Sequence, residues 1–132
     1  MITGIVTDTR EAVISITVRG AGGEQQTLPA VIDTGFDGWL SLPTTIITTL
    51  QLRWSHRGRA QLADGSTTIF DIFQGIVSWD KAMRRIPIDE AETAPLIGMA
   101  LLEGFELNMA IRSGGKVKLK RLRTSLRDQR KK

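Results

Sequence analysis

The sequence lacks the residues on which several common kinds of site depend. It contains no cysteine, so it can form neither a disulfide framework nor a thiolate metal site. Its only histidine is His56, so a zinc site would need carboxylates for nearly all of its ligands. Nucleophile mechanisms that pair serine or cysteine with histidine are equally poorly supported. We therefore expect no metal and no cofactor.

Long apolar runs are also missing. No stretch of the sequence is long enough to span a bilayer. Near the N-terminus, Asp8, Arg10 and Glu11 interrupt the unbroken apolar stretch that a signal peptide would need. These observations favour a cytoplasmic protein with no membrane partner.

The 132 residues suit one domain, and their charge is unevenly distributed. Residues 1–115 hold nine Lys or Arg against thirteen Asp or Glu, a balance of −4. Residues 116–132 hold nine Lys or Arg against Asp128 alone, a balance of +8. We therefore expect a mildly acidic domain over residues 1–115 and a basic C-terminal strand or tail over residues 116–132.

Short β-branched runs separated by turn residues predict a mostly β structure. The turn at Asp64-Gly65 is a strong hairpin signal, and Gly104 suits the end of a short helix over residues 98–103. Pro43 and the residues after it fit either a strand or a helix. The predicted strands cover residues 2–6, 13–18, 25–28, 39–42, 57–62, 66–72, 73–79, 84–88, 105–111 and 116–120.

The segment Ala30–Leu40 contains the most informative feature, an Asp-Thr-Gly that follows an apolar strand. Burying a carboxylate is costly unless it is hydrogen-bonded or partnered, so an Asp delivered to the interior usually has a task. Thr34 can hold the loop with its hydroxyl, and Gly35 lets another backbone or a substrate come close. Asp33 is the candidate catalytic residue, and a structural Asp that caps a turn is the alternative.

This segment resembles the catalytic loop of the retropepsin-like aspartic proteases. A second element of that family, two apolar residues and a glycine behind the loop, is matched by Leu96, Ile97 and Gly98. Between the two, the turn Ala63-Asp64-Gly65-Ser66 resembles the tip of the hairpin that covers the substrate. The resemblance spans about residues 10 to 112, and it favours a helix over residues 44–50.

The resemblance implies an all-β, partly closed barrel with one or two short helices and the activity of an aspartic endopeptidase. Because the chain has one Asp-Thr-Gly, a site with two carboxylates requires a homodimer. It also implies that Asp33, Thr34 and Gly35 form the catalytic loop. The residues expected to bind a protein or peptide substrate are Phe36, Asp37, Ala63, Asp64 and Gly65, while Leu96, Ile97 and Gly98 support the loop.

One position departs from the viral members of the family. There, the residue matched by Asp37 commonly pairs with an Arg that follows the glycine of the second motif, and here that position is Met99. A different cation, or none, must therefore face Asp37.

Other functions stay open. A non-catalytic module could bind a peptide or nucleic acid through its groove and basic tail. As a helix, the tail would place Leu119, Leu122 and Leu126 on one stripe among its cations, suited to nucleic acid or an acidic partner. A solvated extension is the plainer interpretation of the same residues. A third possibility is a regulated form in which the tail occupies the groove of its own dimer.

Overall fold

Six strands close into a barrel at the centre of the molecule. The structure is a computed structural model that describes residues 1–123. About 55% of it is strand and 8% helix. Around the barrel, the strands follow the order β2, β3, β8, β4, β7 and β6, and pairing of Thr17 with Ser78 joins β6 back to β2. The strands are β2 (Ala12–Arg19), β3 (Gln25–Ile32), β8 (Leu96–Ile97), β4 (Leu40–Leu42), β7 (Ala82–Glu90) and β6 (Thr67–Trp79).

Alternating side chains fill the barrel. In β2, Ile14, Ile16 and Val18 point inward and are buried, while Ser15 between them is exposed. This is the period of two that a strand imposes on a sheet with one buried face. Trp79 closes one end of the core, almost fully buried, with Phe105 edge-on at 6.0 Å between ring centroids.

Two short helices complete the barrel, as predicted. α1 (Thr44–Thr49) follows Pro43, and α2 (Met99–Leu102) ends before Gly104, whose φ of 90° only glycine adopts readily. Within residues 1–123, neither helix has the length and apolar character needed to cross a membrane.

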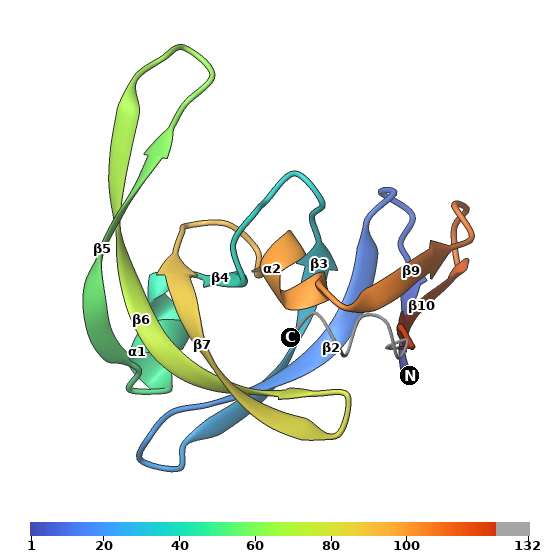
Figure 1. Cartoon of the computed structure of the whole chain (residues 1–132), viewed down its shortest axis with the longest axis horizontal. Helices are drawn as coiled ribbons and strands as arrows, with labels where there is room; N and C mark the ends of the chain where they lie inside the picture. The colour runs from blue at the N-terminus through green and yellow to red at the C-terminus, as the bar shows by residue number, and fades with distance from the viewer. Residues whose placement is uncertain (124–132) are drawn as a thin grey trace.

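A long hairpin projects from the barrel (Figure 1). It consists of β5 (Arg53–Gln61) and the first part of β6. The second part of β6 belongs to the barrel, and its residues Gly75, Val77 and Trp79 are buried. The first three residues of β6 are exposed. Two strands were predicted over residues 66–79, but they are one, because no turn residue separates Ile72 from Phe73.

Three further strands extend the sheet beyond β2. They are β1 (Ile2–Val6), β10 (Lys116–Arg121) and β9 (Phe105–Met109), in that order. The helical interpretation of the tail is therefore wrong for residues 116–121. Val117 and Leu119 are fully buried while Lys116, Lys118 and Lys120, which alternate with them, are exposed, a pattern that only a strand allows. Leu126 and Asp128 lie outside the described residues.

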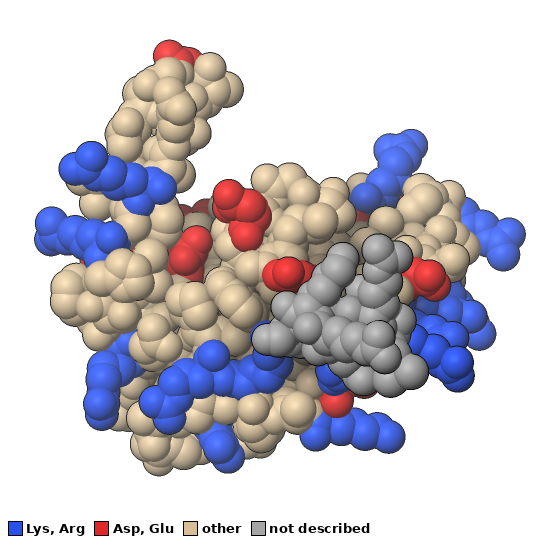
Figure 2. Space-filling view, viewed as in Figure 1, with Lys and Arg blue, Asp and Glu red and all other residues tan. Residues whose placement is uncertain are grey.

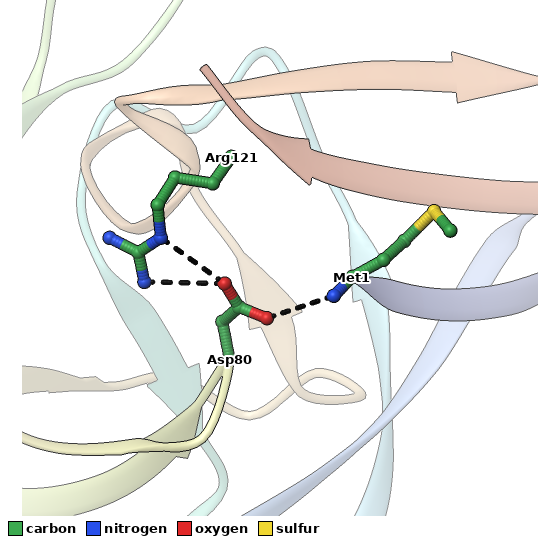
Figure 3. Close-up of polar contacts among 3 residues, drawn as sticks. All are labelled: Met1, Asp80 and Arg121. Atoms are coloured by element: carbon green, nitrogen blue, oxygen red, sulfur yellow. Dashed lines mark hydrogen bonds and ion pairs between the residues drawn. The ribbon is translucent and has the colours of Figure 1, made fainter. Parts of the chain in front are cut away.

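A charged cluster ties this extension to the barrel (Figure 3). The Met1 ammonium lies 3.1 Å from Asp80 Oδ1, and Arg121 Nη2 lies 3.2 Å from Asp80 Oδ2. Asp80 and Lys81 both have positive φ in the tight turn between β6 and β7. The hydrogen bond from the Met1 ammonium, and then Arg121, hold the pKa of Asp80 below its usual value.

Candidate active site

The Asp-Thr-Gly loop leaves the barrel at the end of β3. The Asp33 N–H donates to Ile97 O at 2.9 Å, which continues the parallel pairing of β3 with β8. The Asp33 carboxylate accepts the Gly35 N–H at 2.9 Å, and its main-chain carbonyl accepts the Phe36 N–H at 3.1 Å. These bonds fix the half-buried Asp33 carboxylate on a rigid part of the fold.

The second motif locks this loop from behind. Three backbone bonds join the two segments: Gly98 N–H to Trp39 O at 3.0 Å, Met99 N–H to Phe36 O at 2.8 Å, and Ala100 N–H to Gly38 O at 3.0 Å. A Cβ on Gly98 would lie 2.1 Å from Gly38 O. The glycine is therefore required by close approach of two backbones, since its φ of −98° suits any residue.

Leu96 and Ile97 complete this support. Ile97 is fully buried and Leu96 is half-buried at the groove. Both pair with β3 through β8, immediately before Asp33.

Thr34 and Gly35 lie on the surface of the single chain. Among the side-chain bonds of residues 1–123, the one that caps this loop comes from Asp33 rather than from the Thr34 hydroxyl. Thr34 therefore does not act as a local cap here.

A groove of about 600 Å³ leads from Asp33 to the projecting hairpin. The structure brings Gly35, Phe36 and Asp37 to it, together with Leu96 of the second motif. Its other lining residues, which the sequence did not reveal, are Ser41, Arg59, Ala60, Thr68, Ile69, Phe70, Asp89, Glu90, Ala91 and Thr93.

The predicted hairpin tip does not line this groove. Ala63, Asp64 and Gly65 form the exposed end of the hairpin, where Gly65 has φ 88°. Asp64 Oδ1 accepts the Ser66 N–H at 2.9 Å, and the bonds from Ser66 lower the pKa of Asp64. The tip is a well-formed turn, and the hairpin faces the groove through residues close to this turn, among them Ala60 and Thr68, which pair with each other.

Asp89 is the most informative residue that the sequence did not reveal. It lies near the end of β7 and is half-buried. Burial raises its pKa, the charge of Asp37 raises it further, and His56 opposes both. The signal that could have found it is the apolar run Ile86-Pro87-Ile88 before the acid, which resembles the approach to Asp33.

Met99 lies beside the loop with 48% of its surface exposed. Within residues 1–123, no ion pair involves Asp37, and the three pairs found there join Met1 or Arg121 to Asp80 and Arg57 to Asp71. The same residues contain no group of three His, Asp or Glu side chains placed to hold a metal.

Comparison with known proteins shows the fold. No family model matches the sequence, and no curated protein matches it. Among solved structures, a retropepsin-like aspartic protease from Rickettsia conorii superimposes with a TM-score of 0.53 at 15% identity, over 92% of this chain and 91% of that one. The chain therefore has a retropepsin-like fold, which confirms the predicted all-β barrel.

Proposed function

We propose that the chain is an aspartic endopeptidase that acts as a homodimer, with one catalytic Asp33 from each copy. The observation that carries this proposal is the position of Asp33. Its carboxylate is held by backbone bonds on a rigid loop and faces a groove large enough for a peptide segment.

Two chains are needed because each supplies a single Asp-Thr-Gly loop. Thr34 and Gly35 are exposed on the single chain, so the loop is accessible to a second copy. Across a two-fold axis, two Asp33 carboxylates would lie too close for both to ionise, and they would share one proton. The pair would then contain an acid and a base at the same pH, as in the aspartic proteases generally.

Hydrolysis would use both members of the pair. The ionised Asp33 takes a proton from a water molecule, and the resulting hydroxide attacks the peptide carbonyl carbon. The protonated Asp33 donates its proton to the carbonyl oxygen. When the C–N bond breaks, the Asp33 that took the proton from water gives it to the leaving amine, and the other Asp33 takes a proton from a hydroxyl of the tetrahedral intermediate, which becomes the new carboxyl group, so the shared-proton pair is restored.

Other predicted residues would position the substrate. The Gly35 carbonyl and Asp37 would hold the peptide main chain, and Phe36, which lines the groove, would form part of a pocket. Ala63, Asp64 and Gly65 at the hairpin tip would reach the substrate only when the hairpin bends toward the body.

The test is Asp33→Asn, which keeps the shape of the side chain and removes its charge. We expect hydrolysis of an unfolded protein substrate to fall by at least about a thousandfold, since both acid and base catalysis are lost. Sedimentation and thermal melting should match those of the wild type. Full proteolysis by the variant would refute the proposal.

Mixing the two proteins tests whether each copy contributes one carboxylate. If dimers exchange freely, an equal mixture of wild type and Asp33→Asn should keep about one quarter of the wild-type activity at the same total concentration. If one chain formed the whole active site, the mixture would instead keep about one half of the wild-type activity.

A non-catalytic binding module is the second candidate. The observation that favours it is Met99, which stands exposed where the viral proteases carry an Arg that pairs with the counterpart of Asp37. A protein that stays monomeric at micromolar concentration and binds nucleic acid in a salt-dependent way would support this alternative.

A further inference from the structure

Ser41 is a buried polar residue with no partner in the fold. Only 4% of its surface is exposed, and within residues 1–123 its hydroxyl oxygen makes no hydrogen bond. Ser41 nevertheless lines the groove that contains Asp33. A hydroxyl that is buried without a partner costs folding free energy, so its position at the groove points to a partner that arrives with a ligand.

Two carboxylates, those of Asp37 and Asp89, line the same groove as this hydroxyl. Ser41 is paired with Asp89 in the parallel ladder between β4 and β7. Asp89 Oδ2 in turn lies 3.4 Å from the position that a Cβ would take on Gly38, the residue next to Asp37. At 3.4 Å this contact would be an ordinary one, and the atoms that a Cβ at position 38 would clash with belong to the ring of Phe36, at 2.6 Å.

Repulsion between these acids also acts on the protonation of Asp89. Burial and the charge of Asp37 raise the pKa of Asp89 and His56 opposes them, so a negative charge on Asp89 is disfavoured. No ion pair within residues 1–123 relieves either carboxylate.

Acidic side chains outnumber cations in the lining of the groove. Glu90 adds a third acid, although its carboxylate accepts a hydrogen bond from the Thr44 hydroxyl at 3.0 Å. Arg59 on the hairpin is the cation among the described lining residues. Figure 2 shows acidic side chains in the hollow at the base of the hairpin, whereas Lys and Arg lie around the outside.

We propose that Ser41, Asp37 and Asp89 form a subsite for a lysine or arginine side chain of the substrate. The carboxylates would accept hydrogen bonds from the ammonium or guanidinium group, and the Ser41 hydroxyl would accept one at the floor of the groove. A bound cation would relieve the repulsion between the two acids and give Ser41 its partner. This inference rests on the proposed function, because the subsite and Asp33 line the same groove.

A peptide side chain is the cation that best suits this position. The groove is open along its length and continues to the candidate catalytic carboxylate, so an extended peptide that presents a carbonyl to Asp33 would place a neighbouring side chain near Asp89. The subsite would therefore select for a basic residue at one fixed distance from the cleaved bond.

Cleavage of a peptide library tests the selection. The full chain is incubated with a library of random peptides that includes Lys and Arg at every position, and cleavage sites are read by mass spectrometry. We expect Lys or Arg to be enriched at one fixed position by about tenfold or more, and Asp89→Asn to remove most of that enrichment. Ser41→Ala should weaken it, while Glu106→Gln, an exposed acid of β9, should leave it unchanged.

The failures of the two proposals can be told apart. Cleavage with no preference for Lys or Arg would overturn the subsite and leave the proteolytic function standing. If no peptide is cleaved, a binding assay tests the subsite instead. The Asp33→Asn protein is incubated with two pools of random peptides that differ only in carrying arginine or its uncharged analogue citrulline. Preferential retention of the arginine pool, lost in Asp33→Asn/Asp89→Asn, would support the subsite, and equal retention would overturn it.

Discussion

Gly98→Ala would test whether the second motif holds the catalytic loop in place. The new Cβ would lie 2.1 Å from Gly38 O and 2.7 Å from Phe36 Cδ2. An ordinary carbon–oxygen contact needs about 3.2 Å, so the two backbone segments must separate by roughly 1 Å. The three hydrogen bonds between them, now 2.8 to 3.0 Å long, would then exceed hydrogen-bonding distance.

The loss of unfolding free energy in Gly98→Ala follows from these three bonds. Each contributes about 1 kcal/mol net, so the variant should lose about 3 kcal/mol of unfolding free energy. The backbone at position 98 is extended, so no gain or loss from an unusual φ enters. With an unfolding entropy of about 2.1 cal/mol/K per residue, this loss lowers the Tm of the 132-residue chain by about 10 °C.

The assay is thermal melting followed by circular dichroism, with all proteins at one concentration because dimerisation also raises Tm. Gly22→Ala is the matched control. Its Cβ would meet only the flexible carboxylate of Glu24, so we expect its Tm to stay within about 2 °C of the wild type. Proteolysis by Gly98→Ala should fall by about a hundredfold, because the Asp33 loop is displaced. A Gly98→Ala protein that melts like Gly22→Ala would refute this account of the loop.

Three other predictions concern stability. Burial and Asp37 raise the pKa of Asp89 above its ordinary value of 3.8, so ionising it costs stability at pH above the raised pKa, and that cost disappears as pH falls below 3.8. Asp89→Asn should therefore raise Tm at pH 7 and not at pH 3, whereas a lower Tm at pH 7 would contradict a raised pKa of Asp89. For Asp80 the effect of ionisation on stability has the opposite sign. Its lowered pKa gives stability that is present above pH 3.8 and is lost as pH falls through the lowered value. Asp80→Asn should accordingly lower Tm at pH 7, and a melt equal to that of the wild type would show that the cluster with Met1 and Arg121 contributes nothing. Finally, removal of residues 124–132 should preserve the folded domain, whereas removal of residues 116–132 deletes β10 from between β1 and β9 and should unfold it. Similar melts for the two truncations would show that β10 is dispensable.

Local patterns in the sequence predicted most of the strands. The alternation around Ile14 and Ile16 and the turn at Asp64-Gly65 depend on neighbouring residues alone, and the structure has strands and a turn at these positions. The secondary structure of residues 116–121 was harder to predict, because Leu119 fits both the apolar stripe of a helix and the alternation of a strand. Pairing with β1 and β9, which are far away in the sequence, decides for the strand.

The candidate site was only partly visible in the same way. Asp33 and Gly98 could be found because each belongs to a short motif with a recognisable order. Ser41 and Asp89 could not be brought together from the sequence, since 47 residues separate them and only the parallel ladder between β4 and β7 makes them neighbours. The hairpin was also predicted, but the sequence did not reveal that Ala60 and Thr68 would line the groove while Asp64 at the tip would not.

The sequence by itself determined that each chain carries one Asp-Thr-Gly loop and an apolar pair with glycine to support it, because such features depend on the order of adjacent residues. Only the tertiary structure decided which side chains share the groove with Asp33. Pairing of distant strands sets those contacts, and the burial of Ser41 and Asp89 follows from the closed barrel rather than from their own neighbours along the chain.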